Sequence, residues 1–123
     1  MKTTVIVDSD VIVEYLKTGK GILPTIYEKF NMIVAPSTFT ELLASKTFTD
    51  ETLKQEVVDF LDKYFTVQPI DKTIAVEASK LVRDYELTLG TAYVGAMALR
   101  TGAKLVTNDR RSFERIPGID FLE

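Results

Sequence analysis

The residues of this sequence best suited to chemistry are carboxylates placed just after predicted strands. Asp8 comes directly after a β-branched run, Asp109 follows a second predicted strand by one residue, and Glu41 lies in the first turn of the helix predicted after a third. Carboxylate oxygens are the hard ligands that Mg²⁺ and Mn²⁺ prefer. An acidic cluster that holds such an ion can activate a bound water and orient a phosphodiester for in-line attack. We therefore predict a divalent metal site formed by Asp8, Glu41 and Asp109.

The composition excludes most other kinds of catalytic site. The 123 residues contain no cysteine and no histidine, which rules out disulfides, thiolate or imidazole ligands and serine–histidine triads. The hydrophobic fraction of 46% and the charged fraction of 27% are those of an ordinary globular chain. The net charge of −3 argues against non-specific binding of polyanions by the whole surface. Acid–base or metal chemistry must come from carboxylates, hydroxyls, lysine or tyrosine.

From the sequence we expect neither an export signal nor a membrane-spanning segment. The segment Met1–Leu16 places acids within its apolar stretch and lacks a small-residue cleavage site, unlike a signal peptide. No apolar run approaches the roughly 20 residues that a membrane span requires. We therefore expect a cytoplasmic protein with no membrane partner.

Strands that alternate with helices must position the acids. Short apolar or β-branched runs predict strands at Thr3–Val7, Met32–Ala35, Phe65–Ile70 and Lys104–Thr107, with Ile119–Phe121 as a candidate fifth. Apolar spacing and capping residues predict helices at Val11–Leu16, Ile22–Phe30, Thr38–Ser45 and Asp50–Tyr64, then one from Asp71 through Tyr85 and one from Thr88 to Gly102.

This alternation predicts the fold class. Strands joined by helical crossovers form a parallel sheet covered on both faces. We predict a three-layer α/β/α sandwich with four to five parallel strands, in a single domain spanning residues 1–123. Because sites in such sheets form at the carboxyl ends of the strands, the three acids are expected to meet there.

Each acid also has an ordinary structural role open to it. Asp8 and Asp10 suit a strand-end turn and a helix N-cap, Glu41 suits the second half of a capping box that begins at Thr38, and Asp109 suits a turn. Taken singly, these roles are the better interpretation. The predicted meeting of three acids at one edge favours the metal site.

The same segments resemble a known family. Residues 5–16 (VIVDSDVIVEYL), 36–44 (PSTFTELLA) and 105–117 (LVTNDRRSFERIP) resemble, in order and spacing, the acidic motifs of PIN domains, most closely the toxin ribonucleases of VapBC toxin–antitoxin pairs. The resemblance implies a Mg²⁺- or Mn²⁺-dependent endoribonuclease that hydrolyses RNA with a metal-activated water. Asp8 and Asp109 would be direct ligands, and Glu41 would bind the metal or its water. It also implies a homodimer and a cognate VapB-like antitoxin that blocks the site.

One segment departs from the family pattern. Where the family usually has Leu-Ser-x-x-Asp-Ala, this chain has Leu-Thr-Leu-Gly-Thr-Ala over residues 87–92, so Thr88 takes the cap position and Thr91 the aspartate position. A carboxylate about 5 Å from a divalent ion, at an effective dielectric of ~40 to 80, contributes roughly 2–3 kcal/mol, on the order of 10- to 10²-fold in metal affinity. Asp10 is the acid best placed to compensate in part.

Basic and apolar residues indicate partners. Arg110, Arg111 and Arg115 follow the last acid and predict a substrate-binding rim for RNA phosphates, with a solvated surface turn as the equal alternative. Phe113 is predicted to anchor that turn in the core rather than to stack on a base. The tyrosines and three apolar residues suit an interface or the core equally: Ile22, Ile26 and Phe30.

Two other functions are alternatives to the toxin ribonuclease. A catalytically degenerate PIN-like domain would bind RNA or a protein partner, and Thr91 is the feature that supports it. A receiver-type signalling domain would use Asp8 and Asp10 as its acidic pair. It would also need a phosphoacceptor aspartate at the end of a middle strand, and none follows Val34 or Val67. The prediction is therefore a metal-dependent endoribonuclease, with the degenerate domain as the alternative.

Overall fold

Four parallel strands form one sheet in the order β3-β2-β1-β4 in a computed structural model that describes residues 2–48 and 50–123. The strands are β1 (Thr4–Val7), β2 (Asn31–Val34), β3 (Thr66–Val67) and β4 (Lys104–Val106). In the register, Ile6 of the central β1 lies opposite Ile33 on one side and Leu105 on the other. The predicted parallel α/β sheet is confirmed. The candidate fifth strand is reduced to a single parallel bridge between Leu105 and Phe121.

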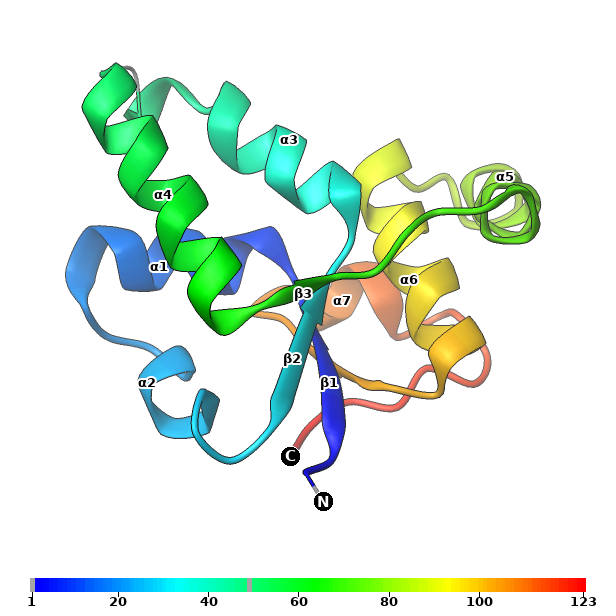
Figure 1. Ribbon diagram of the computed structural model, residues 1–123. Helices are drawn as coiled ribbons and strands as arrows, with labels where there is room; N and C mark the ends of the chain where they lie inside the picture. Colours follow the sequence, from blue (N-terminus) through cyan, green and yellow to red (C-terminus); the bar gives the residue numbers. More distant parts are fainter. Residues whose placement is uncertain (1, 49) are drawn as a thin grey trace.

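Helices cover both faces of this sheet. They are α1 (Ser9–Thr18), α2 (Leu23–Ile26), α3 (Pro36–Ala44), α4 (Glu51–Tyr64), α5 (Lys72–Tyr85), α6 (Leu89–Thr101) and α7 (Arg110–Phe113), with a 3₁₀ turn at Lys46–Phe48. In Figure 1, α1, α2 and α4 gather on one side of the sheet and α5, α6 and α7 on the other, while α3 runs past the carboxyl ends of the strands. The chain termini lie together at the opposite end.

Two apolar cores sit between the sheet and its helices. Alternate strand residues point to opposite faces, so Ile6, Ile33 and Leu105 belong to the core under α5 and α6. Val5, Val7 and Val34 belong to the core under α1, α3 and α4. This is the three-layer arrangement that the sequence predicted. Phe113 is only 1% exposed in the first core, where it anchors α7 as expected.

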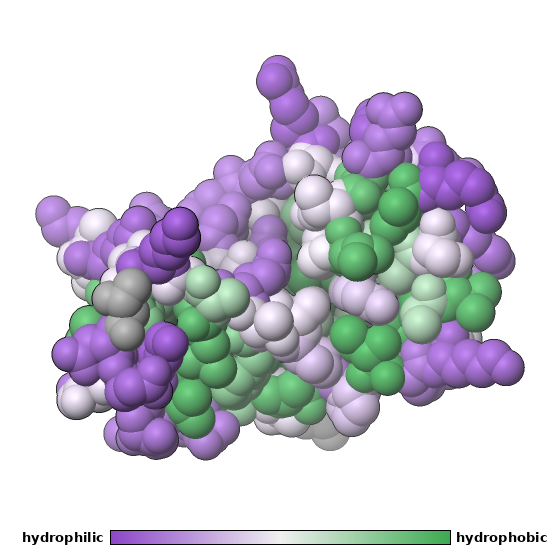
Figure 2. All heavy atoms as spheres, turned by 90° about the horizontal axis from the view of Figure 1, so that it is seen from above, coloured by the Kyte–Doolittle hydropathy of each residue, from purple (hydrophilic) through white to green (hydrophobic). Residues whose placement is uncertain are grey.

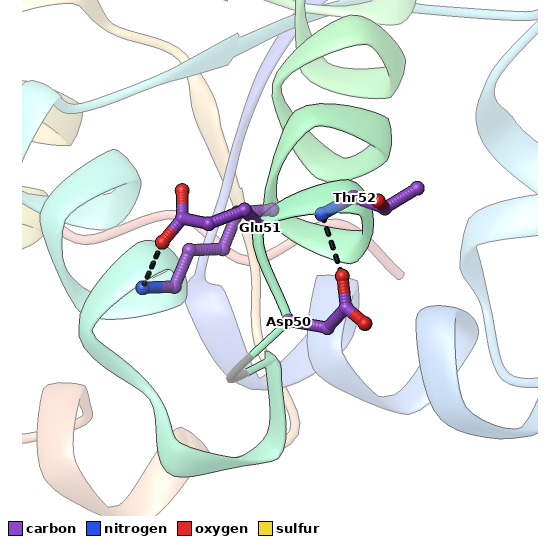
Figure 3. A network of polar contacts seen from close by, with 4 residues as sticks. Asp50, Glu51 and Thr52 are labelled. Atoms are coloured by element: carbon purple, nitrogen blue, oxygen red, sulfur yellow. Dashed lines mark hydrogen bonds and ion pairs between the residues drawn. The ribbon is translucent and has the colours of Figure 1, made fainter.

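Side chains cap the starts of α4, α5 and α6, as predicted for Asp71 and Thr88. The Asp50 carboxylate accepts the Thr52 N–H at 2.7 Å at the start of α4, beside a Lys54–Glu51 ion pair of 3.4 Å (Figure 3). Asp71 caps α5 in the same way, and Thr88 caps α6. These side chains satisfy backbone donors that have no partner within the helix.

The start of α3 differs from the prediction. The helix begins at Pro36, whose fixed φ suits the first helical position, and not at a Thr38 cap. Thr38 is fully buried, and its hydroxyl has no hydrogen-bond partner among the described residues. The predicted capping box was therefore wrong, and Glu41 lies in the second turn of α3 rather than the first.

Three other boundaries differ as well. β3 pairs with β2 only at Thr66 and Val67, so the predicted strand Phe65–Ile70 was too long. α2 spans four residues in place of the predicted Ile22–Phe30. A short helix, α7, forms where a turn was predicted, because Asp109 caps it. Within the described residues, no helix combines the length and apolar character needed to cross a membrane.

Candidate active site

Asp8 lies directly after β1, beside the end of the neighbouring strand β4. Its carboxylate accepts the Ser9 N–H at 2.9 Å as the cap of α1 and the Thr107 hydroxyl at 2.9 Å. Its own backbone N–H donates to the Val106 carbonyl at 2.9 Å. The end of β1 and the end of β4 are therefore tied together at this residue. Thr107, 99 positions away in sequence, fixes the Asp8 side chain.

Asp10 belongs to the same cluster. Its Oδ2 lies 3.5 Å from the Thr107 hydroxyl, and its Oδ1 accepts the Asn108 N–H at 3.2 Å. The Asn108 side chain in turn donates to Glu14 Oε1 at 3.0 Å. The first turns of α1 thus present Asp8, Asp10 and Glu14 toward the segment that follows β4.

Asp109 follows Thr107 and Asn108, but its side chain is turned toward the start of α7. Its backbone N–H donates to Thr107 Oγ1 at 3.0 Å. Its carboxylate accepts the Ser112 N–H at 3.3 Å and the Ser112 hydroxyl, which makes it the cap of α7. Its negative charge is still close enough to raise the pKa of Asp10. Asp109 is therefore near enough to Asp10 for their charges to repel each other.

Glu41 approaches from the other side, where α3 contacts α6. A Cβ added at Gly90 would lie 3.0 Å from the Glu41 Cδ and 2.6 Å from its Oε2, so the carboxylate rests on the bare backbone of the first turn of α6. A carboxylate is favoured there by the helix dipole. Any larger residue at position 90 would displace it.

Thr91 is held in the same turn of α6. Its N–H donates to Thr88 Oγ1 at 3.3 Å, and the Thr88 hydroxyl donates to Thr91 Oγ1 at 3.1 Å. The position expected to carry the fourth acid is thus occupied by a neutral hydroxyl engaged with the helix cap. Thr91 directly follows Gly90, the residue against which the Glu41 carboxylate rests.

Burial raises the pKa of three acids, and repulsion from neighbouring carboxylates adds to the effect for two of them. The pKa of Asp8 is raised from 3.8 to about 6 by burial first, then by the charges of Asp10 and Glu41, against the lowering effect of the Thr107 and Ser9 hydrogen bonds. Burial is also the main cause that raises the pKa of Asp10, with the charge of Asp109 adding to it. Burial alone raises the pKa of Glu41. A nearby cation would favour the ionised carboxylates and so lower these pKa values again.

The donor set fits a hydrated divalent ion better than a dehydrated one. The side chains of the cluster that could coordinate a metal offer carboxylate and hydroxyl oxygens, the ligands that Mg²⁺ and Mn²⁺ take. Among the residues the structure describes, no group of three acids converges closely enough to enclose an ion. Mg²⁺ needs only one or two carboxylates and keeps several waters. The pair Asp8 and Asp10, bridged by Thr107, suits that requirement.

The three arginines predicted as a substrate rim differ in their surroundings. Arg110 contacts the Leu122 carbonyl at 3.1 Å and Glu123 at 3.4 Å and lies over the Phe121 ring. Arg115 donates to the Tyr85 carbonyl at 2.8 Å. Arg111 is exposed and enters no ion pair within the described part of the chain. Two of the three therefore also hold the fold together.

The apolar residues suggested for an interface are mostly core. Ile26 is 4% exposed, and Ile22 and Phe30 pack against the same core. The tyrosines are more accessible: Tyr15, Tyr27 and Tyr64 line a recess of about 320 Å³ together with Gly19, Leu23, Pro24 and Phe60. Figure 2, seen from the side of α3, shows apolar surface in two areas with a more polar band between them.

Sequence reasoning missed the residues that support the acids. Thr107 ends the strand predicted at Lys104–Thr107, and Asn108 separates that strand from Asp109. Neither Glu14 nor Gly90 belongs to the predicted metal site. The only local signal was the polar pair Thr107-Asn108 directly before Asp109. Their partners lie 94 to 99 positions away, so only the folded chain reveals them.

The parallel sheet, its two helical layers and the acids at its carboxyl edge define an α/β domain with a carboxylate site. The PIN domain family model matches residues 5–119. The chain therefore belongs to the PIN domain family, as the sequence resemblance implied.

The fold is similar to that of several solved structures. The chain is similar to VapBC-1 from nontypeable Haemophilus influenzae (TM-score 0.83, 14% identity, 98% of each chain covered). It is also similar to VapBC2 from Rickettsia felis, bound to a promoter DNA fragment (TM-score 0.80, 16% identity, 98% of each chain). A toxin–antitoxin complex from Klebsiella pneumoniae gives a TM-score of 0.76 at 21% identity over 94% of each chain. No curated protein matches the sequence significantly.

Proposed function

We propose that this protein is the toxin of a type II toxin–antitoxin pair, a cytoplasmic Mg²⁺- or Mn²⁺-dependent endoribonuclease that hydrolyses RNA phosphodiesters. The observation that carries the proposal is the meeting of the Asp8 and Asp10 carboxylates at the Thr107 hydroxyl, 2.9 and 3.5 Å from it, at the carboxyl end of β1. Burial raises the pKa of both acids, and a bound cation would offset this effect. Membership of the PIN family and the fold shared with VapBC chains support it.

The proposed roles are those that the family resemblance implies, with Asp10 added because its carboxylate lies near the same Thr107 hydroxyl as that of Asp8. Asp8 and Asp109 would hold the ion directly, Glu41 would hold the ion or one of its waters, and Asp10 would add charge beside Asp8. A bound ion would supply Lewis acidity, lower the pKa of a water and offset the charge of the phosphodiester. Thr91 would be a weak neutral substitute for the fourth acid.

The remaining polar residues would prepare the site and bind RNA. The Thr107 hydroxyl holds the Asp8 carboxylate in one orientation, so no side-chain rotation is needed when substrate arrives. Arg111, with its exposed guanidinium, would contact a phosphate flanking the scissile bond. Arg110 and Arg115 would add positive charge to the same rim while keeping their contacts within the chain.

Protein partners are proposed on the same basis. The similar solved structures are complexes that include an antitoxin, and we propose a VapB-like antitoxin and a homodimer for this chain as well. Light scattering of the purified protein, alone and after co-expression with the product of a neighbouring short gene, tests both. A monomer that binds no such product contradicts this part of the proposal.

A degenerate domain is the second candidate, and Thr91 favours it. With a hydroxyl in place of the fourth acid, the site can retain metal yet fail in the chemical step. The protein would then act by binding RNA or a protein. Cleavage of single-stranded RNA by the unaltered protein in Mn²⁺ excludes this candidate.

The deciding experiment combines calorimetry and cleavage. Mn²⁺ is titrated into the wild type and into Asp8→Asn, and the same proteins are incubated with single-stranded RNA. The proposal predicts one Mn²⁺ site in the wild type and the loss of this site in Asp8→Asn. It also predicts that cleavage requires both Mn²⁺ and the Asp8 carboxylate. Equal Mn²⁺ binding by the two proteins contradicts the assigned site. Binding without cleavage, with cleavage gained in Thr91→Asp, supports the degenerate candidate.

A further inference from the structure

We propose that Glu14 is a positioning residue: with Asn108 it forms a clamp that fixes the turn carrying Asp109, and Gly21 keeps the Glu14 carboxylate in place. The inference rests on the proposed function, because it assigns Glu14 a role in shaping that site. Glu14 is not a ligand or a catalytic group in this scheme. It acts only through Asn108.

The clamp has two contacts on one helix. Asp10 and Glu14 are four residues apart, so they share a face of α1. Asn108 donates its backbone N–H to Asp10 Oδ1 at 3.2 Å and its side-chain amide to Glu14 Oε1 at 3.0 Å. Asn108 is thus hydrogen-bonded to α1 through both its main chain and its side chain. Hydrogen bonds to charged acceptors are stronger than neutral ones.

The orientation of Asp109 depends on this clamp. Asp109 is the next residue, and its N–H is held by Thr107 Oγ1 at 3.0 Å. The helix that it caps has only four residues, too few to be stable without tertiary support. Fixing Asn108 therefore fixes both the start of α7 and the side from which the Asp109 carboxylate enters the cluster.

The absence of a side chain at Gly21 leaves room for the Glu14 carboxylate. A Cβ at position 21 would lie 2.7 Å from the Glu14 Cδ and still closer to its Oε1, so any side chain there must push the carboxylate away. Gly21 has a φ of +95°, and Gly19 in the same loop has a φ of +70° with nothing within 4 Å of an added Cβ. The two glycines share the backbone requirement but differ in their contact with Glu14.

This difference supplies a matched pair of variants. Gly21→Ala displaces the Glu14 carboxylate, whereas Gly19→Ala introduces a methyl group at positive φ without touching it. Glu14→Ala removes the acceptor, and Glu14→Gln keeps a side-chain oxygen for the Asn108 amide. Asn108→Ala removes the donor. Its control is Asn31→Ala, which removes a 3.3 Å bond to the Lys2 carbonyl at the far end of the sheet.

Two readouts are measured on the full chain. Hydrogen exchange of the backbone amides over residues 107–113, without metal, reports on the turn, and calorimetry gives the Mn²⁺ affinity. For Glu14→Ala, Asn108→Ala and Gly21→Ala, we expect exchange to speed up about tenfold and Mn²⁺ to bind several-fold more weakly, as for loss of one hydrogen bond to a charged group. Gly19→Ala and Asn31→Ala should stay within about twofold of the wild type. Glu14→Gln keeps a neutral, weaker acceptor and should fall between the wild type and Glu14→Ala.

The outcomes separate this inference from the proposed function. If the wild type binds no Mn²⁺, the proposed function fails, while the exchange rates still decide whether the clamp holds the turn. If the wild type binds Mn²⁺ but Gly21→Ala matches Gly19→Ala in both readouts, the clamp is refuted. It is also refuted if Glu14→Gln behaves like Glu14→Ala, because the charge would then matter and the hydrogen bond would not.

Discussion

Replacing Asp8 by asparagine should stabilise the metal-free protein at neutral pH. Burial, then the charge of Asp10, raises the pKa of Asp8 from 3.8 to about 6, so the folded protein holds this proton more tightly than the unfolded chain does. Protonated Asp8 therefore contributes fully to the free energy of unfolding below about pH 4. This contribution is lost as the pH rises from about 4 to about 6, and it stays lost at higher pH. A pKa difference of about 2.2, at about 1.36 kcal/mol each, gives a cost of roughly 3 kcal/mol at pH 7.5.

The net gain from Asp8→Asn is smaller than this cost. The amide oxygen can still accept the Thr107 hydroxyl, but it cannot also accept the Ser9 N–H that the second carboxylate oxygen now accepts. Loss of one such bond removes about 1 kcal/mol. We therefore expect the variant to be more stable than the wild type by about 1–2 kcal/mol at pH 7.5 in a metal-free buffer.

Urea unfolding in EDTA at pH 7.5 and pH 5.0 measures the effect. The wild type should recover about half of the Asp8 cost at pH 5.0, whereas Asp8→Asn should not recover it, so the gap between the two proteins narrows. Mn²⁺ in place of EDTA should stabilise the wild type alone. Asp62→Asn, an exposed position on α4, is the charge-matched control. A variant that is less stable than the wild type at pH 7.5, or a gap that does not change with pH, refutes the reasoning.

Three further substitutions test other parts of the structure. Thr91→Asp adds the missing carboxylate beside Glu41 and should tighten Mn²⁺ binding by roughly 10- to 10²-fold in calorimetry; unchanged affinity would place position 91 outside the site. Thr107→Val keeps the shape but removes the hydroxyl that Asp8 accepts, so the pKa of Asp8 should rise further in an NMR titration, and a fall would contradict the assignment. Phe113→Ala empties a fully buried position and should cost about 3–5 kcal/mol in urea unfolding, whereas a base-stacking residue would leave stability unchanged and weaken RNA binding.

Much of the fold follows from local patterns. The buried strands β1, β2 and β4 are short apolar runs, and Asp71 and Thr88 cap the helices they were predicted to cap. Helix starts that depend on tertiary packing were harder to predict. The capping pattern at Thr38 was misleading because that side chain is drawn into the core, and Pro36 provides the start instead.

The sequence by itself determined which chemistry is available to this protein. Without histidine or cysteine, any metal site must use oxygen ligands, and a hydroxyl at position 91 leaves one carboxylate fewer than the family pattern. It also placed Asp8 and Asp109 at strand ends, and parallel strands bring such ends to one edge. These conclusions depend only on residue type and order along the chain.

Only the tertiary structure decided how the acids are held and charged. Asp8 is oriented by Thr107, and Asn108 is clamped by Asp10 and Glu14, across 94 to 99 positions of sequence. The pKa of Asp8 depends on its burial and on its distance from other charges. Desolvation and Coulomb energy are functions of position in space, and no local pattern along the chain contains them.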